Sequence, residues 1–213
     1  MLIVGLTGGI ASGKTVVSQV LKEEGAYLID ADQIARELVE PHKPAWDELK
    51  RVFGDQIVDS DGSIHRKKLA AIVFSNPQQR DLLDRLLHPR IKEEMRHRVE
   101  EIAREDPEAM VVIDGALLVE SGFYREMDQL IVVTSSARKQ IERLRDRDGA
   151  SPEEAQRIIS SQMPLDEKMK VADFVIENEG LFEETKRRAK EVFQELKRSA
   201  VQSRAGLKCQ ETT

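Results

Sequence analysis

The chain has 213 residues, 40% of them hydrophobic and 34% charged, which is the composition of a soluble globular protein with one domain carrying inserted subdomains or with two small domains. Its net charge of −6 gives no support for non-specific binding to nucleic acid, so we expect no such partner. The single cysteine, Cys209, excludes an internal disulfide, and no apolar run is long enough to span a bilayer. With an apolar N-terminus that lacks a basic leader, these features predict a cytoplasmic protein without a membrane partner.

The N-terminal segment shows the pattern of a strand, a glycine-rich loop, a helix and a second strand. An apolar run at 2–6 ends in glycines, which is typical of a strand buried on both faces. A helical stripe of apolar residues at 16–21 stops at Gly25, and a second apolar run follows at 26–29. This order indicates the opening unit of an α/β fold with a parallel sheet.

A mainly helical region and three further strand-like runs follow this unit. Residues 33–105 form the helical region, which His88-Pro89 interrupts; on spacing alone this histidine favours a surface or capping role. The tail, 199–213, is polar and lacks a period, so we expect it to be disordered. The predicted strands are 110–113, 130–133 and 174–176, and the predicted helices are 137–148, 152–162 and a last one that reaches Leu196.

The glycine-rich loop carries the most specific motif that the spacing reveals. Gly8-x-x-x-x-Gly13-Lys14-Thr15 matches the Walker A pattern and lies between a strand and an amphipathic helix, as the motif requires. A chance match is expected in on the order of 1% of chains of this size. In a true match the backbone N–H groups converge on an anion, the lysine reaches the β- and γ-phosphates, and the threonine offers a hydroxyl to Mg²⁺.

The motif predicts a P-loop NTPase-type parallel sheet of five strands, flanked by helices, that binds a nucleoside triphosphate with Mg²⁺. It fixes neither the nucleotide nor the reaction. The residues expected at the phosphates are Gly8, Gly9, Ala11, Ser12, Gly13, Lys14, Thr15 and Val16.

Aspartates follow two of the predicted strands. Asp30 and Asp32 come after the second strand, where one of them could orient an acceptor hydroxyl and take its proton; we prefer Asp32, although either could simply cap the next helix. Asp114 ends the strand at 110–113, the place of a Walker-B-type partner that reaches magnesium through water, or of a turn residue before Gly115.

Basic side chains recur on the helix at 137–148. Lys139, Arg143 and Arg147 share one face at a spacing of four residues and could neutralise charge on a transferring phosphoryl group. The alternative is a solvated face paired with Glu142 and Asp146, which is the usual explanation of such a charge run.

Several segments together resemble the dephospho-CoA kinase family, over about residues 2–196. The resemblance is far more specific than the P-loop alone. The segments are Leu6 to Thr15 at the P-loop, Ile29-Asp30-Ala31-Asp32 with Ile34-Ala35-Arg36, His88-Pro89-Arg90-Ile91, Leu117-Leu118-Val119-Glu120, Gln140 to Arg147 at the lid helix, and Ala172-Asp173 with Asn178.

The resemblance implies phosphorylation of the ribose 3′-hydroxyl of dephospho-CoA by ATP with Mg²⁺, giving CoA and ADP, the last step of coenzyme A biosynthesis. It implies that Asp32 is the base, that the helical insertion holds the acceptor, and that Arg143 and Arg147 belong to a lid. The implied partners are these two small molecules, and no obligate protein partner is inferred. The remaining implied residues are Arg36, His88, Leu117 and Glu120 at the acceptor, and Asn178 near adenine.

The resemblance also suggests domain limits. They are a nucleotide-binding core at 1–32, 106–136 and 170–198, an acceptor subdomain at 33–105, and a lid at 137–169.

Departures from the family pattern are small. Ala11 stands where glycine is frequent and implies a loop φ that tolerates a Cβ, Thr15 replaces serine but keeps the hydroxyl, and Ala116 stands where proline is frequent.

Two alternatives stay open at this point. Another small-molecule kinase, such as a nucleoside monophosphate kinase, would share the P-loop, the lid and the size. A nucleotide-dependent switch would hydrolyse slowly and respond to a protein partner. Turnover that depends on a small hydroxyl-bearing acceptor separates the two classes.

Overall fold

The computed structural model describes residues 1–210, apart from the side chains of residues 74, 75 and 202–210, and it divides into two compact units. Unit 1 contains Met1–Ile29 and the chain from Ile102 onward, and unit 2 contains Asp30–Glu101. The thiol of Cys209 lies outside the described side chains.

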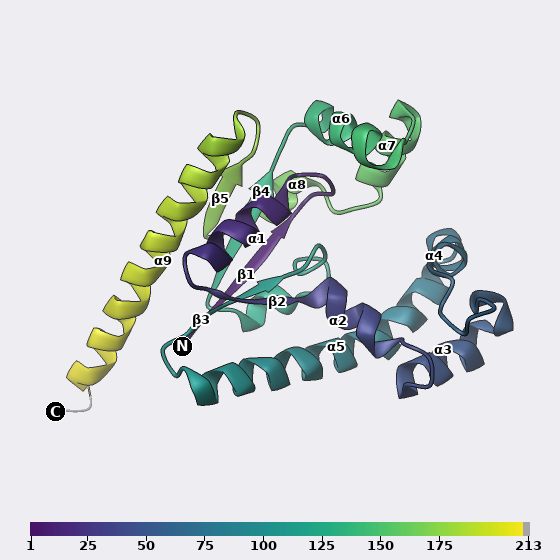
Figure 1. The fold of residues 1–213 in the computed structure, drawn as a ribbon, viewed down its shortest axis with the longest axis horizontal. Helices are drawn as coiled ribbons and strands as arrows, with labels where there is room; N and C mark the ends of the chain where they lie inside the picture. The colour runs from purple at the N-terminus through teal and green to yellow at the C-terminus, as the bar shows by residue number, and fades with distance from the viewer. Residues whose placement is uncertain (211–213) are drawn as a thin grey trace. The chain divides into compact units, whose positions relative to one another are not determined.

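Unit 1 holds the sheet and the helices that flank it (Figure 1). Its elements are β1 (Leu2–Gly8), α1 (Lys14–Glu23), β2 (Tyr27–Asp30, whose last residue begins unit 2), β3 (Met110–Asp114), η2 (Phe123–Glu126), β4 (Gln129–Thr134), α6 (Ala137–Asp148), α7 (Pro152–Ser160), α8 (Leu165–Met169), β5 (Phe174–Glu177) and α9 (Phe182–Gln210). Unit 2 consists of α2 (Ala31–Leu38), α3 (Pro44–Phe53), η1 (Asp55–Ile57), α4 (Arg66–Ser75) and most of α5 (Pro77–Glu105).

The strands form one parallel sheet of five strands in the order β2-β3-β1-β4-β5, which confirms the predicted fold class. The register pairs Leu6 of β1 with Asp114 of β3, and Gly8 of β1 with Val133 of β4. Because the strands are parallel, their carboxyl ends share one edge, which is where ligands bind in open α/β sheets. Gly8 and Asp114 are the last residues of their strands, so both belong to this edge.

Helices α1 and α9 lie side by side over one face of the sheet (Figure 1). Each presents an apolar stripe at helical spacing, and the two stripes pack on strand residues of alternating position. This is the main core of unit 1. Its helical members are Val17, Val20 and Leu21 from α1 and Ala189, Val192, Phe193 and Leu196 from α9.

The opposite face of the sheet is covered by the chain around α8. Leu130 and Val132 of β4 point away from the α1–α9 layer because side chains alternate along a strand. They pack with Val119, and further apolar side chains close over them. Helix α8 was not predicted, since five residues are too few to show a helical period. The covering residues are Tyr124, Met163, Leu165, Met169 and Ala172.

Unit 2 has a core of its own. Trp46 of α3 is 8% exposed and donates from its indole nitrogen to the carbonyl of Gly62 at 2.8 Å, which ties α3 to the turn before α4. Buried apolar side chains from α3, η1, α4 and α5 surround it. They are Ala45, Leu49, Phe53, Ile57, Ile64, Leu69, Val73 and Leu86.

The prediction that His88-Pro89 interrupts the helical stretch is wrong, because α5 continues through Pro89. A proline inside a helix removes one backbone hydrogen bond. Here the Arg90 guanidinium donates to the carbonyl of Leu86 at 2.6 Å, and buried side chains on both sides of the proline hold the helix in place. These side chains are Leu86, Ile91, Met95 and Val99.

The expectation of a disordered tail at 199–213 is also wrong for most of that segment. Helix α9 continues to Gln210, and residues 211–213 lie outside the described part of the chain. The segment is rich in Ala, Arg, Lys and Gln, which have high helix propensity, and it extends a helix already nucleated on the core.

The main core can be tested with two phenylalanines of α9. Phe193 is 1% exposed and Phe182 is 53% exposed. We expect Phe193→Ala to lower the free energy of unfolding by about 3–5 kcal/mol, because it removes a fully buried ring. Phe182→Ala, the matched control, should change it by less than about 0.5 kcal/mol. Denaturant unfolding measures both; equal losses would show that α9 does not pack as described.

Candidate active site

The loop between β1 and α1 requires glycine at two positions for different reasons. Gly13 is the N-cap of α1 with a φ of 90°, and a Cβ there would collide with the side-chain amide of Asn178. At Gly8 a Cβ would lie 2.5 Å from the carbonyl oxygen of Val133. The backbone of the loop is therefore fixed by its surroundings, as an anion-binding loop requires.

Ala11 adopts a left-handed conformation, with a φ of 56°. The expected φ was one that tolerates a Cβ. The observed one accommodates a Cβ only at an energetic cost, since L-residues other than glycine are disfavoured in this region. The loop keeps the geometry that a glycine would adopt there although the residue is alanine.

Two hydroxyl groups of the loop differ in their surroundings. Thr15 is exposed in the first turn of α1, so its hydroxyl is accessible to a ligand. Ser12 is fully buried, and its Oγ has no hydrogen-bond partner within residues 1–210. A buried hydroxyl without a partner is uncommon in folded proteins. Both positions were predicted to bind the phosphates or the metal, which no observation tests.

The side chains of Lys14 and Asp114 form an ion pair that links the start of α1 to the end of β3. Asp114 is 7% exposed, so its carboxylate is largely shielded from water. The structure thus brings the predicted Walker-B aspartate to the P-loop lysine. A lysine and an acid at this place can share a bound phosphate and its metal ion.

Asn178, just after β5, holds the loop from behind. Its Nδ2 donates to the carbonyl of Ser12 at 2.8 Å, and its Oδ1 accepts from the hydroxyl of Thr185 at 2.9 Å. The residue is 7% exposed. The structure therefore brings Asn178 to the P-loop, as predicted for a nucleotide-site residue, but both ends of its amide are engaged within the protein. Contact with adenine stays a prediction.

Arg143 of α6 also contacts the loop, whereas Arg147 does not. The Arg143 guanidinium donates to the carbonyl of Ala11 at 3.0 Å and to that of Asn178 at 2.9 Å. Arg147 pairs with Asp148 at 2.7 Å and is exposed. The Asp148 carboxylate raises the pKa of Arg147, whose guanidinium in turn lowers the pKa of that carboxyl.

Helix α6 is anchored at its first residue as well. Its N-cap, Ser136, donates from its hydroxyl to Glu179 at 2.8 Å, and its backbone N–H binds the same carboxylate. The backbone contact, followed by the hydroxyl contact, lowers the pKa of Glu179. Because Glu179 follows Asn178 directly, the segment after β5 is tied both to the P-loop and to α6.

Two glutamines that the sequence analysis missed hold the backbone of Ile10 from both sides. Gln140 of α6 donates to its carbonyl at 2.7 Å, and Gln162, after α7, accepts from its N–H at 2.8 Å. Gln140 is 3% exposed. Its signal in the sequence was a polar residue placed three positions before Arg143, on the same helix, but nothing there predicted burial.

A buried lysine, Lys168 of α8, was likewise missed. Its ammonium lies against the loop and against Glu120, which was predicted to contact the acceptor. Leu117 of the same predicted acceptor segment is 44% exposed. The acceptor roles of Leu117 and Glu120 stay predictions.

In unit 2 the structure separates the roles of the two aspartates after β2. Asp30 is the N-cap of α2, and its carboxylate accepts from the N–H of Gln33 at 2.8 Å. Asp32 lies in the first turn of the same helix and is exposed. The capping alternative therefore applies to Asp30, and the role of Asp32 as base stays a prediction.

The other predicted acceptor residues of unit 2 lie on two helices. Arg36 is exposed in the last turn of α2. His88 is on α5, with its Nε2 3.5 Å from a carboxylate oxygen of Asp84, one turn earlier. A histidine beside an acid can hold a positive charge for a phosphate group, but no observation tests this role.

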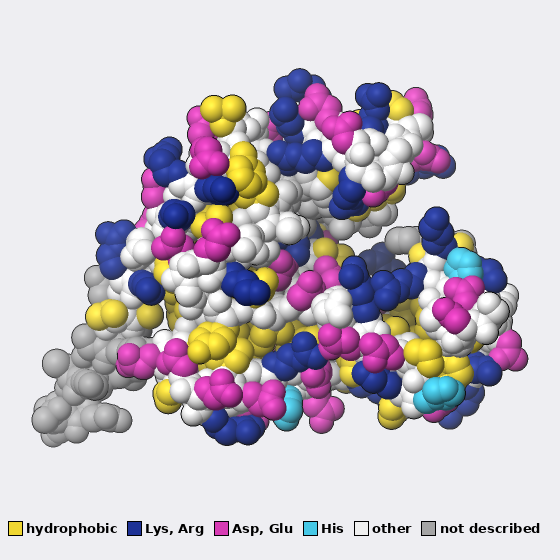
Figure 2. Space-filling view, viewed as in Figure 1, with side chains coloured by type: hydrophobic (Ala, Val, Ile, Leu, Met, Phe, Trp, Pro, Cys, Tyr) yellow, Lys and Arg dark blue, Asp and Glu magenta, His cyan; other side chains and the backbone are white. Residues whose placement is uncertain are grey.

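Charged side chains of both signs cover α6 and α7 (Figure 2). Arg138 pairs with Glu142 at 3.4 Å, and Lys139 lies 3.4 Å from the same glutamate. The predicted basic face of α6 is thus divided. Arg143 reaches the P-loop, while Lys139 belongs to the solvated, paired surface that was the alternative explanation.

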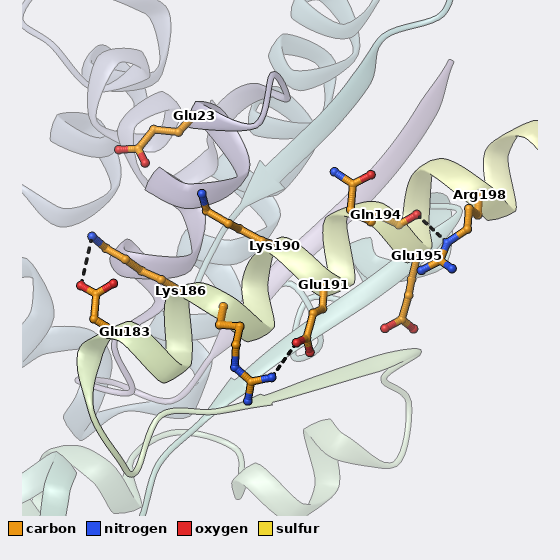
Figure 3. A pocket seen from close by; sticks show the side chains of 9 residues that line it. Glu23, Glu183, Lys186, Lys190, Glu191, Gln194, Glu195 and Arg198 are labelled. Carbon is orange, nitrogen blue, oxygen red and sulfur yellow. Dashed lines mark hydrogen bonds and ion pairs between the residues drawn. The ribbon is translucent and has the colours of Figure 1, made fainter.

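A groove beside α9 is a second concavity, but its chemistry does not suit a nucleotide. Figure 3 shows acidic and basic side chains of α9 that line the groove together with Glu23 of α1. Lys186 pairs with Glu183 at 3.6 Å and Arg187 with Glu191 at 2.8 Å, so the charges neutralise one another. The groove shares no residue with the P-loop.

Comparison with known proteins gives the family of this chain. The family model of the dephospho-CoA kinases matches residues 2–184 of the chain. The chain belongs to the dephospho-CoA kinase family. The dephospho-CoA kinase of Bacillus cereus is 46% identical over 185 residues, which cover 87% of this chain and 92% of that protein. That of Corynebacterium glutamicum is 41% identical over 196 residues, covering 92% and 98%.

Solved structures agree with membership of the dephospho-CoA kinase family. A crystal structure from Thermus thermophilus is 34% identical, with a TM-score of 0.77 over 92% of this chain and 97% of that one. The dephospho-CoA kinase from Campylobacter jejuni is 25% identical, with a TM-score of 0.59 over 91% of this chain and 96% of that one.

The left-handed alanine gives a testable prediction. We expect Ala11→Gly to leave the free energy of unfolding unchanged or to raise it by up to about 1 kcal/mol, because relief of backbone strain offsets the extra freedom of glycine in the unfolded chain. Ala70→Gly, in the middle of helix α4, is the matched control and should lose about 1 kcal/mol. Denaturant unfolding measures both changes, and a loss at Ala11 as large as that at Ala70 would contradict the observed φ.

Proposed function

We propose that this protein transfers the γ-phosphoryl group of ATP to the ribose 3′-hydroxyl of dephospho-CoA, giving CoA and ADP. The observation that carries the proposal is the P-loop at the carboxyl edge of the sheet, with Lys14 against Asp114, in a chain of the dephospho-CoA kinase family. A nucleotide-dependent switch without a small acceptor is not favoured by any observation, and neither is a nucleoside monophosphate kinase.

The loop binds the triphosphate mainly through its backbone. We expect backbone N–H groups of the loop to contact the phosphate oxygens, apart from those of Ser12 and Val16, which donate to the carbonyls of Gly9 and Gly13. The N-terminus of α1 adds its favourable dipole. Lys14 lies at the β- and γ-phosphates, whose oxygens compete with Asp114 for its ammonium. The reacting phosphoryl group is thereby held at the edge of the sheet where acceptors bind in this type of fold.

The residues present fit a magnesium ion. Thr15 offers an exposed hydroxyl, and Asp114 offers a carboxylate at the adjacent strand end that reaches the ion through water. Mg²⁺ takes one or two protein oxygens and fills its remaining positions with water and phosphate oxygens, so this pair suffices. When bound, the ion neutralises charge that develops on the phosphates.

Asp32 acts as the base on the acceptor side. It accepts the proton of the ribose 3′-hydroxyl as that oxygen attacks the γ-phosphorus, and its availability follows from the capping of α2 by Asp30 instead. Arg36 contributes positive charge, and His88 a hydrogen-bond donor, toward the phosphates of dephospho-CoA, while Leu117 and Glu120 contact the acceptor from the turn after β3.

Helices α6 and α7 act as the lid. Arg143 is already beside the loop and is placed to stabilise the charge of the transferring group, whereas Arg147 must leave Asp148 to do so.

Within residues 1–210 there is no helix that is long and apolar enough to cross a membrane. We further infer a cytoplasmic location, with the two small molecules as the only partners that the reaction requires.

The decisive experiment is a coupled assay of ADP release with ATP, Mg²⁺ and one acceptor at a time. We expect turnover with dephospho-CoA and a rate at least about 10²-fold lower with AMP or CMP, because a site that orients one hydroxyl discriminates strongly against acceptors that place it elsewhere. Faster turnover with AMP or CMP would assign the protein to the nucleoside monophosphate kinases.

The two aspartates of α2 test the assignment of the base. Asp32→Asn should lower kcat by about 10²–10⁴-fold with little change in ATP binding, since the amide keeps the shape but cannot accept the proton. Asp30→Asn is the matched control, because asparagine caps helices as well as aspartate does. The measurement is kcat with saturating dephospho-CoA. A near-wild-type rate for Asp32→Asn would remove Asp32 from the mechanism.

A further inference from the structure

Lys168 is a fully buried cation between α8 and the phosphate loop. Its side chain is 0% exposed, so the charge has no contact with water. Burying an ammonium is unfavourable unless its donors find acceptors. Here the ammonium donates to the carbonyl of Ala116 at 2.9 Å and, at a longer 3.5 Å, to that of Gly8, and a carboxylate oxygen of Glu120 lies 2.7 Å away as its counter-charge.

The two carbonyls that accept from this ammonium belong to the phosphate loop and to the turn after Asp114, both of which the proposed reaction requires. Gly8 is the first glycine of the phosphate loop, and Ala116 lies in the turn just after Asp114. The hydroxyl of Thr7 donates to the same Ala116 carbonyl at 3.2 Å, so this turn is fixed to the end of β1 twice. The ammonium therefore links the start of the phosphate loop to the turn that follows Asp114, the aspartate paired with Lys14.

The carboxylate of Glu120 compensates the charge of Lys168 rather than completing a hydrogen-bond network. Its oxygens are buried, and neither has a directed hydrogen bond within the described residues, so the contact with Lys168 is an electrostatic one. Buried ion pairs contribute little net stability, and apolar replacements of similar size are often neutral or stabilising. Stability alone thus gives no reason for a cation at this position, whereas the placement of two backbone carbonyls does.

We propose that Lys168 is a positioning residue for phosphoryl transfer, which holds the Gly8 and Ala116 carbonyls so that the phosphate loop and Asp114 keep the geometry needed to bind ATP. The reaction itself is the one proposed above, on which this role rests. Lys168 does not touch the reacting atoms. It acts through the backbone at the ends of β1 and β3, and Glu120 neutralises its charge.

Three variants separate positioning from folding. Lys168→Met removes the charge but keeps the length of the side chain. Lys168→Met combined with Glu120→Gln also removes the carboxylate that would otherwise stay buried without its partner. Lys170→Met is the matched control, because Lys170 is an exposed lysine two residues away that pairs only with Glu167 in the part of the chain described.

The readouts are the thermal midpoint and the dissociation constant for ATP with Mg²⁺, measured by titration calorimetry without acceptor. We expect Lys168→Met to lower the midpoint and to weaken ATP binding about tenfold or more, since it releases hydrogen bonds from a charged donor to the loop. The double variant should recover the midpoint but not the ATP affinity. Lys170→Met should match the wild type in both.

Other outcomes overturn the proposal. If ATP affinity returns together with the thermal midpoint in the double variant, Lys168 serves only to compensate Glu120. If Lys168→Met does not fold, the double variant is compared with the wild type directly, and unchanged ATP affinity rejects the role. Because these measurements need no acceptor, they stand even if the ADP-release assay finds an acceptor other than dephospho-CoA.

Discussion

The constraint on which the site depends is the direction of the carbonyl groups in the phosphate loop. A backbone that turns its N–H groups toward an anion turns its carbonyls toward the protein, and buried carbonyls need donors. Side chains from three other parts of unit 1 meet this need, so the loop is shaped by α6, α8 and the end of β5 as much as by its own glycines. The pairs are Gly8 with Lys168, Ile10 with Gln140, Ala11 with Arg143, and Ser12 with Asn178.

Features of the fold and site that depend on short stretches of sequence could be predicted, whereas those that depend on tertiary contacts could not. The strands and the loop were predicted because alternation, apolar runs and Gly8 to Thr15 are local patterns, and the sheet confirmed them. Two of the donors, Gln140 and Lys168, were not predicted, because their sequence context is that of surface residues and only the topology brings α6 and α8 to β1. The predicted interruption at Pro89 was wrong because a tertiary effect overrides a local signal. The packing of buried side chains on both sides of Pro89 outweighs one lost hydrogen bond.

The structure shows which of the two aspartates after β2 caps the following helix, which the sequence left open. Periodicity alone could not choose between them, and a capping role was open to both. Asp30 accepts a hydrogen bond from the N–H of Gln33 and so caps α2, while the carboxylate of Asp32, in the first turn of α2, is exposed. The sequence alone could not decide this, because the choice depends on where the helix begins, which differs from the predicted limit by a residue or two.

The pairing of Lys14 with Asp114 has a consequence for which anions the loop accepts. A cation already neutralised by a carboxylate gains little from a small anion such as inorganic phosphate, which must displace the acid with few other contacts to offset the exchange. A nucleotide chelated to a divalent ion brings its own positive charge to Asp114 and several oxygens to the backbone at once. Any anion that binds at Lys14 therefore has to offset the loss of this ion pair.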